Sequence, residues 1–428
     1  MKKLAFVNAH LVDPSQNLNR EGTLIIQDQK ISEILTRSNL KFDDKKFRII
    51  DCKNKILCAG FVDIKCHLRV PGEEYKENLS YASKSAAAGG ITSVVCMPNT
   101  DPVIDNVSVV EFLQRKARKE SDVKIYSTAS ITKGLNGKDI TEFGLLNEAG
   151  AVGFTDAIKA VSDTNVMMRA LKYASAFDVL IMQYPEEASL SREGCMNSGV
   201  LSSQLGLKGI PIEAEVIQVD RDLRLTEMTN SKIHFFNITS RLALESIQDA
   251  KKRGVKVSCS TSPHYFNLTE EDIRKWRTFA KLAPPLRDRK NLEAVKTGIK
   301  NNTINCITSD HSPHDTDSKR LPFEQASSGI IGFESLLPLT LKLIKEKKMK
   351  IDKLVELISL NPAKLLNLDA GTLQKGKPAD IVVFDPNKTI NLSSNLIKSK
   401  SKNFPYENLK IKGKVYITMV DGKIIYNA

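Results

Sequence analysis

The stretch GFVDIKCHLR, residues 60–69, begins as an apolar run and ends in polar side chains, just before Val70-Pro71-Gly72. Successive side chains of a strand point to opposite faces, so Asp63, Lys65 and His67 share one face. We expect this face to point inward, which predicts a buried strand whose end presents polar groups.

Seven further stretches of the same kind follow, and several are almost continuously apolar, as expected for parallel strands covered on both faces. The predicted strands are 60–67, 91–97, 123–129, 150–155, 178–183, 232–238, 255–260 and 304–309. Helical patterns separate them at 78–89, 106–119, 141–149, 164–175, 211–229, 241–253 and 289–300. Eight strand–helix units in sequence predict a (β/α)8 barrel of the TIM type, with a doubly wound open sheet as the alternative.

The two ends of the chain have a different character, because each consists of short strands separated by turns. Neither end is long enough to form a comfortable sheet domain alone. We therefore expect residues 1–57 and 367–428 to pair into one small composite β-sandwich domain beside a barrel of residues 58–366. Helical patterns at 329–345 and 351–366 bridge the barrel and the tail.

Composition narrows the class of protein further. Of 428 residues, 41% are hydrophobic and 26% charged, which is typical of globular proteins. No apolar run approaches the roughly 20 residues that a membrane helix needs. The first ten residues lack the apolar core and cleavage site of a signal peptide, so we expect a cytoplasmic protein and no membrane partner.

The net charge of +13 would suit a nucleic-acid partner, but the lysines are scattered and lack interleaved aromatic residues. We therefore expect solvated helix faces and no nucleic acid. The seven cysteines contain no C-x-x-C pair, which favours reduced thiols in the core over disulfides or a metal cluster.

Active residues of such a barrel come from the C-terminal ends of its strands. The predicted ends carry Lys65, His67, Arg69, Asn99, Asp156, Gln183, Asn237, Asp310 and His314.

These residues, and the whole length of the chain, resemble dihydroorotases of the long, zinc-dependent type. The resemblance rests on an ordered series: Asp63-x-x-x-His67-x-Arg69, Pro71-Gly72-Glu73, Met97-Pro98-Asn99-Thr100, Gly153-Phe154-Thr155-Asp156, Pro284-Pro285-Leu286-Arg287 and Ser309-Asp310-His311-Ser312-Pro313-His314. It implies a hydrolase of the amidohydrolase superfamily that interconverts carbamoyl aspartate and dihydroorotate in pyrimidine biosynthesis.

The resemblance also implies roles for individual residues. Asp310 matches the aspartate that shuttles the proton. Arg69, Asn99 and His314 match the groups that hold the ligand carboxylate. His67, Asp156 and Asp310 stand at metal-ligand positions.

Three other positions depart from the family pattern: Lys65, Gln183 and Asn237 replace histidine ligands. A protonated lysine has no lone pair to give to a metal, and amide oxygens are weak ligands for zinc. His234 does not replace the missing ligand on its strand, since three positions along a strand reach the opposite face. We expect a degenerate metal site with no bound cofactor, in which the Lys65 ammonium serves as counter-ion to Asp156 and Asp310. If the protein is active, zinc or another divalent metal is expected.

Inactive dihydroorotase homologues of some bacteria pair with aspartate carbamoyltransferase, and the lost histidines resemble that branch. The main hypothesis is a non-catalytic, homo-oligomeric protein that scaffolds or stabilises this partner. The alternative is an active dihydroorotase with a depleted, mononuclear metal site. A hydantoinase- or allantoinase-like amidohydrolase is the third reading, and it is disfavoured because Arg69, Asn99 and His314 suit a ligand carboxylate.

Overall fold

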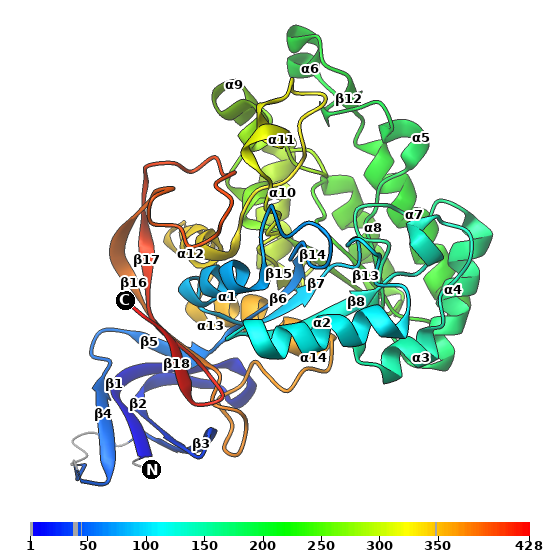
Figure 1. Ribbon diagram of the computed structural model, residues 1–428. Coiled ribbons are helices and arrows are strands. Elements are labelled where there is room, and N and C mark those ends of the chain that lie inside the picture. The colour runs from blue at the N-terminus through cyan, green and yellow to red at the C-terminus, as the bar shows by residue number, and fades with distance from the viewer. Residues whose placement is uncertain (1–2, 37–41, 44, 347–348) are drawn as a thin grey trace.

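Eight parallel strands form the predicted barrel in the computed structural model, which describes residues 3–36, 42–43, 45–346 and 349–428 (Figure 1). They pair in chain order: β6 (Phe61–Cys66), β7 (Ile91–Cys96), β8 (Lys124–Ala129), β9 (Ala151–Phe154), β10 (Ile181–Gln183), β13 (Ile233–Phe235), β14 (Val257–Thr261) and β15 (Cys306–Ile307). A parallel bridge between Cys66 and His311 joins the last strand to the first. The barrel prediction is therefore confirmed, and the open-sheet alternative is not.

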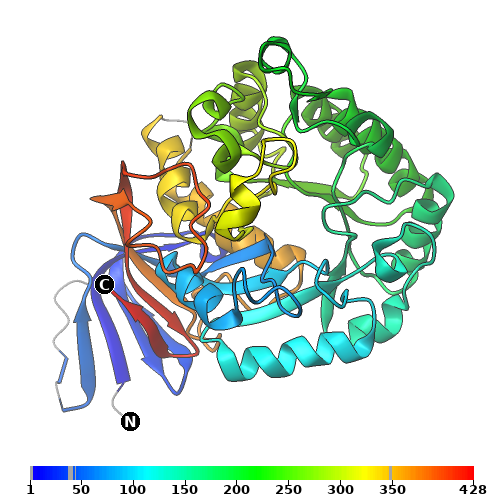
Figure 2. The same ribbon diagram turned by 45° about the horizontal axis from the view of Figure 1, so that its top comes forward.

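Helices surround the strands, as Figure 2 shows. The long ones are α1 (Leu79–Ala88), α2 (Val107–Glu120), α4 (Thr164–Ala176), α7 (Glu213–Thr229), α8 (Arg241–Lys252), α10 (Arg289–Lys300) and α12 (Leu336–Lys345). Shorter helices are α3 (Phe143–Glu148), α5 (Ala188–Ser191), α6 (Val200–Leu205), α9 (Asp272–Trp276), α11 (Thr316–Arg320), α13 (Ile351–Val355) and α14 (Asn361–Leu365). Many begin at a side chain that accepts a backbone N–H of the first turn: Asn78, Asn106, Asp163, Ser240 and Asp288.

The two ends of the chain share one mixed sheet, seen at the lower left of Figure 1. Its strands are β1 (Lys3–Asp13), β2 (Leu18–Gln27), β3 (Lys30–Leu35), β4 (Phe47–Asp51), β5 (Ile56–Ala59), β16 (Ile381–Leu392), β17 (Leu409–Val420) and β18 (Lys423–Asn427). The N-terminal and C-terminal strands meet where β5 pairs with β16. The composite domain is thus present as predicted, and we propose residues 57/58 and 366/367 as its limits. Residues 1–2, 37–41 and 44 of that range lie outside the described part.

The connection between β16 and β17, residues 393–408, leaves this sheet and reaches the mouth of the barrel. Asn403 Nδ2 donates to the carbonyl oxygens of Ser312 (2.9 Å) and Gly329 (3.1 Å). Its Oδ1 accepts the backbone N–H of His314 (3.1 Å). Tyr406 Oη is 2.9 Å from His264 Nδ1. The terminal domain therefore supplies a strap, residues 393–408, across the end of the barrel where the polar strand ends gather.

Several small elements were not predicted from the sequence, among them the short helices α5, α6, α9 and α11. A pair of two-residue strands, β11 (Met196–Asn197) and β12 (Gly209–Ile210), lies with α5 and α6 between β10 and α7.

None of the described helices is long and apolar enough to cross a membrane.

Candidate functional site

Lys65 at the end of β6 forms an ion pair with Asp310, which follows β15. The two side chains are 2% and 5% exposed. Asn237 Nδ2 donates to the other oxygen of the Asp310 carboxylate at 2.8 Å. Each oxygen of Asp310 therefore has a donor of its own, and the ammonium of Lys65 compensates the buried charge. This arrangement confirms that Lys65 is a counter-ion within the barrel mouth.

Asp156 is buried at the end of β9 and has different partners. Its carboxylate accepts the Thr132 hydroxyl (2.5 Å) and the backbone N–H groups of Ile131 (2.9 Å) and Thr132 (3.0 Å). Burial raises the pKa of Asp156, and the hydrogen bonds from Thr132 oppose that rise. The expectation that Lys65 serves both aspartates is therefore wrong for Asp156, because neutral donors of the loop after β8 take that place.

Gln183 ends β10 and points to helix α7. Its Nε2 donates to Asp222 at 3.0 Å, and that buried carboxylate also accepts Gln218 (2.9 Å) and Arg221 (2.7 Å). The side chain at the position of a lost histidine thus belongs to a structural network. His234 points into the barrel interior below the mouth, within hydrogen-bond distance of Ser258 (2.7 Å) and Ser260 (3.0 Å), and does not replace the missing ligand.

His67 follows β6 directly and lines the pocket at the barrel mouth. Burial lowers its pKa well below the usual range, and the cations Arg69 and Lys65 add to this effect. The ring is therefore neutral at neutral pH. Its Nδ1 is 2.9 Å from Asn99 Oδ1, so Nδ1 carries the proton and Nε2 keeps a free lone pair.

Arg69 and His314 line the same cavity as Lys65, His67 and Asn99, with a volume of about 330 Å³. The Arg69 guanidinium donates to Glu73 (2.8 Å), to the Pro313 carbonyl (3.1 Å) and to Ser312 (3.1 Å). Burial lowers the pKa of His314 to about 2, and the charge of Arg69 contributes. The three predicted carboxylate-binding groups are thus brought together, but Arg69 already has a carboxylate partner in Glu73.

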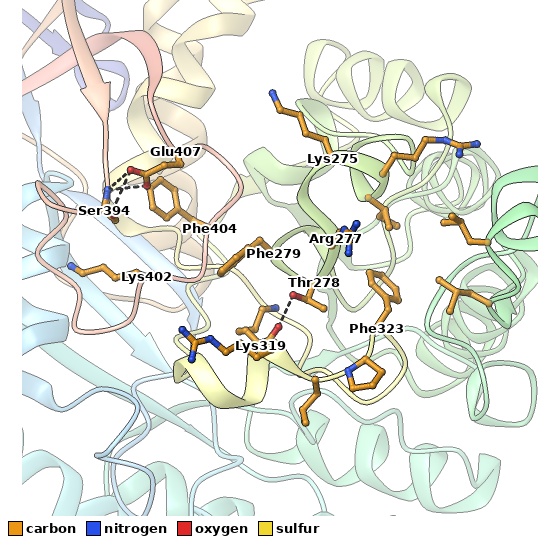
Figure 3. A pocket seen from close by; sticks show the side chains of 17 residues that line it. Lys275, Arg277, Thr278, Phe279, Lys319, Phe323, Ser394, Lys402, Phe404 and Glu407 are labelled. Carbon is orange, nitrogen blue, oxygen red and sulfur yellow. Dashed lines mark hydrogen bonds between the residues drawn. The ribbon is translucent and has the colours of Figure 1, made fainter.

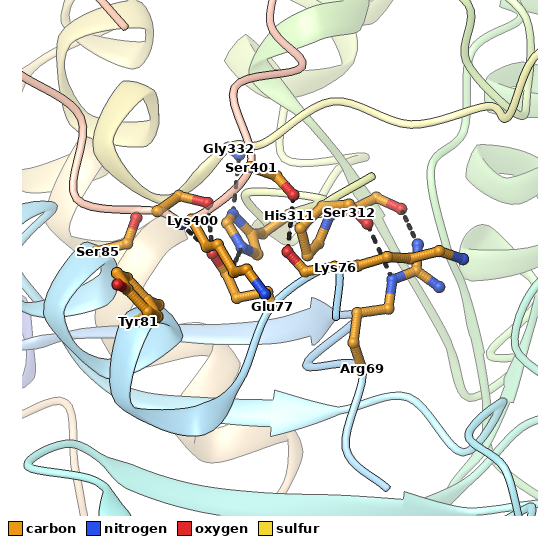
Figure 4. A network of polar contacts seen from close by, with 12 residues as sticks. Arg69, Lys76, Glu77, Tyr81, Ser85, His311, Ser312, Gly332, Lys400 and Ser401 are labelled. Carbon is orange, nitrogen blue, oxygen red and sulfur yellow. Dashed lines mark hydrogen bonds and ion pairs between the residues drawn. The ribbon is translucent and has the colours of Figure 1, made fainter. Parts of the chain in front are cut away.

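A second buried pair, which the sequence did not reveal, stabilises the barrel mouth (Figure 4). His311 Nε2 lies 2.6 Å from Glu77, and the His311 ring stacks on Phe333 with centroids 3.8 Å apart. The other Glu77 oxygen accepts the Ser399 hydroxyl (2.5 Å) and the Lys400 N–H (2.8 Å). Glu77 therefore joins the first strand–helix loop to the strap. His311 lies in one of the family-like motifs, but no local pattern indicates that it pairs with Glu77.

The donor set at the mouth does not fit the zinc that the resemblance implies. Zinc takes nitrogen, sulfur or carboxylate ligands, usually four of them. His67 Nε2 is suitable, whereas Asp310 and Asp156 are engaged elsewhere and the Lys65 ammonium would repel a cation. Gln183 Oε1 and Asn237 Oδ1 have no hydrogen-bond partner within the described part of the chain, but neutral amide oxygens suit harder ions. Over the same residues, no three His, Cys, Asp or Glu side chains are placed to hold one ion together.

Comparison with protein families gives two overlapping matches. The model described as "Dihydro-orotase-like" matches residues 54–243. The model described as "Amidohydrolase family" matches residues 213–425. Together they cover the barrel and most of the C-terminal strands.

Curated relatives match over almost the entire chain. A dihydroorotase of Acetivibrio thermocellus is 44% identical over 417 residues, which cover 97% of each chain. A dihydroorotase of Syntrophus aciditrophicus is 42% identical over 424 residues and covers 99% of each.

Solved structures confirm the architecture. The L-hydantoinase of Arthrobacter aurescens superposes with a TM-score of 0.88 over 100% of this chain and 96% of its own, at 22% identity. A D-hydantoinase gives 0.85 over 99% and 95%, also at 22% identity. At this level of identity the likeness concerns the fold alone.

Proposed function

The chain belongs to the dihydroorotase family of the amidohydrolase superfamily, and on this premise we propose that it takes part in pyrimidine biosynthesis. We further propose that its barrel pocket binds a ligand without a catalytic metal. Its pocket retains the family's carboxylate-binding groups and replaces the metal with a protein cation.

One observation carries this proposal: the ion pair between Lys65 and Asp310. The aspartate that matches the family's proton shuttle is already bound by an ammonium and by Asn237. Both oxygens of this carboxylate already accept hydrogen bonds, so a substrate would have to compete with Lys65 and Asn237 for them. A buried ammonium also opposes entry of a divalent cation through Coulomb repulsion in a site of low dielectric.

The pocket still suits a small carboxylate ligand. Arg69, Asn99 and His314 line one cavity with Lys65 and His67. Cavities of about 300–1,000 Å³ accommodate small metabolites, so the volume of about 330 Å³ admits a ligand of the size of dihydroorotate or carbamoyl aspartate. We propose binding without turnover, with Arg69 shared between the ligand carboxylate and Glu73.

An active dihydroorotase is the second candidate, and the comparisons favour it over a purely structural role. The full-length relatives at 42–44% identity are named dihydroorotase. Activity would depend on a mononuclear site at His67, with Asp156 or Asp310 released from its present partners. The shared fold is the only support for a hydantoinase-like activity among these comparisons.

A scaffolding role toward aspartate carbamoyltransferase, with the chain as a homo-oligomer, stays a proposal that the comparisons do not support. It is tested by mixing the two purified proteins and measuring the sedimentation of the mixture. A joint species supports the role, and independent sedimentation at micromolar concentration contradicts it.

The activity assay decides between the two candidates. Hydrolysis of dihydroorotate is followed with the purified chain, with and without added zinc or manganese. We expect no turnover above the buffer rate under any of these conditions. Metal-stimulated turnover that Asp310→Ala abolishes would establish the active dihydroorotase instead.

A further inference from the structure

A second cavity, of about 1290 Å³, lies outside the barrel mouth and shares no lining residue with the barrel pocket (Figure 3). Its walls come from α9, the following turn Arg277–Ala280, helix α11 with the loop after it, and the strap. We call it the basic groove. The lining residues are Leu205, Leu207, Ile273, Arg274, Lys275, Arg277, the segment 278–279, the segment 319–323, Ser394, Lys402, Phe404 and Glu407.

The charge of the groove is strongly one-sided. Six of its lining residues are lysine or arginine, and Glu407 is the one carboxylate among them. That carboxylate already accepts the Ser394 N–H at 3.0 Å and lies within hydrogen-bond distance of the Ser393 and Ser394 hydroxyls. The groove therefore has a large excess of positive charge that its own lining does not neutralise.

Four of the basic side chains have no carboxylate partner among the described residues; three of them are exposed, and the fourth, Lys319, is buried with a pKa lowered to about 7. Lys319 donates to the carbonyl oxygens of Ser327 (2.7 Å) and Gly329 (3.2 Å). Lys402 donates to those of Ile397 (2.7 Å) and Ser399 (2.7 Å). Arg277 and Arg320 are exposed. By contrast, Arg274 at the edge of the groove is paired with Glu271 at 3.0 Å.

Large apolar side chains stand among these cations. Leu205, Phe279 and Leu321 are 39%, 40% and 44% exposed. A solvated charged face does not need exposed leucine and phenylalanine, whereas apolar patches rimmed by polar groups are typical of binding sites. The combination of unpaired cations with exposed apolar groups indicates an occupant that has both carboxylates and apolar side chains.

We propose that the basic groove binds an acidic segment of a partner polypeptide, in which glutamate or aspartate alternates with aliphatic or aromatic residues. The volume exceeds the range of about 300–1,000 Å³ for small-molecule sites, which favours a chain segment over a metabolite. Of the three phenylalanines in the lining only Phe279 is exposed, and the other apolar lining is mostly aliphatic (Leu205, Leu207, Ile273 and Leu321), which favours a polypeptide over a run of stacked bases. This inference does not depend on the activity of the barrel pocket.

The probe for the test is a short fluorescent peptide in which glutamate alternates with leucine and phenylalanine, and the readout is its anisotropy with the full-length protein. We expect saturable binding that weakens as salt is raised, because salt screens exposed charges. The variant Arg277→Glu/Arg320→Glu should weaken binding by about tenfold or more. The matched control Arg20→Glu/Lys30→Glu changes two exposed cations on β2 and β3 and should bind like the wild type.

Three results would overturn the proposal. One is equal binding of the wild type and the Arg277→Glu/Arg320→Glu variant, provided that both have the same thermal transition. Another is equal binding of a peptide in which lysine replaces every glutamate. The third is tighter binding of a single-stranded oligonucleotide than of the acidic peptide. Weaker peptide binding by the Leu321→Ser variant, with the salt dependence retained, would support the apolar contribution.

Discussion

Lys65 Nζ and the Asp310 carboxylate form a buried ion pair across 245 positions of the chain, where the first and last strands of the barrel close on each other. Asn237 is the third member of this contact, because it donates to the other carboxylate oxygen. The Lys65 ammonium therefore balances the charge of Asp310.

Removal of one partner of this pair tests its role. Lys65→Met leaves Asp310 as a buried charge with only Asn237 as donor, and breaking a buried pair costs about 3–5 kcal/mol. We expect a loss of that order in the free energy of unfolding, measured with urea near pH 7. The double variant Lys65→Met/Asp310→Asn removes the charge and should regain most of the loss. A change below about 1 kcal/mol in the single variant contradicts a stabilising pair.

Restoring the histidines should restore metal binding if the departure from the family is confined to the site. The triple variant Lys65→His/Gln183→His/Asn237→His replaces the cation and two amides with nitrogen ligands and frees Asp310. We expect it to retain close to one equivalent of zinc, or more, by elemental analysis. The control Gln183→His leaves Lys65 in place and should retain none. A folded triple variant without zinc would show that the mouth has diverged beyond these three positions.

The strap provides a third test through Asn403. Its side chain makes three hydrogen bonds to the segments 312–314 and 329, and it is 2% exposed. Asn403→Ala leaves buried backbone groups unpaired, and each such group lowers the free energy of unfolding by about 1–3 kcal/mol. We expect unfolding to become easier by about 2–4 kcal/mol, with faster amide exchange at 312–329. Asn387→Ala, at an exposed position, should stay within about 0.5 kcal/mol of the wild type.

Lys319 predicts a pH dependence of stability. The side chain is 3% exposed, and burial, with a smaller effect of Lys281, lowers its pKa to about 7. In the unfolded chain a lysine stays protonated to about pH 10. Between these values the unfolded state binds more protons, so stability from this group rises with pH above about 7.

The free energy of unfolding of the wild type minus that of Lys319→Met should therefore increase between pH 7 and 9, by at most about 1.4 kcal/mol per pH unit. Urea titrations at several pH values measure this difference, and Lys345→Met on the exposed end of α12 serves as the control. A difference that stays constant or falls with pH contradicts a depressed pKa of Lys319.

The barrel could be predicted from sequence because its strands are nearly continuous apolar runs. Predicted and observed strands overlap in all eight cases, although 304–309 shortens to Cys306–Ile307. Strand alternation excluded His234 from the position of Asn237, but it did not predict that His234 points into the barrel interior toward Ser258 and Ser260. Most helix boundaries agree to within a few residues, since Asn78, Asn106 and Ser240 are recognisable caps, but the helix predicted at 329–345 begins only at Leu336.

The partners of the site residues could not be predicted in the same way. The hydrogen bond of Gln183 to Asp222 and the pairing of Glu77 with His311 depend on how distant strands and helices pack. Asp156 was expected beside a lysine, but the loop at 131–132 reaches it first with two N–H groups and a hydroxyl. Sequence indicates which groups stand at a strand end, whereas their partners depend on loops that carry no pattern.

The most direct test of the central claim is the metal content of the full-length chain, purified without chelator from cells grown with added zinc and measured by elemental analysis against the protein concentration. Because Lys65 balances Asp310 and no histidine stands at positions 65, 183 and 237, we predict well below one tenth of an equivalent of zinc or manganese per chain. A full equivalent of metal that resists dialysis would contradict the claim and favour the active dihydroorotase.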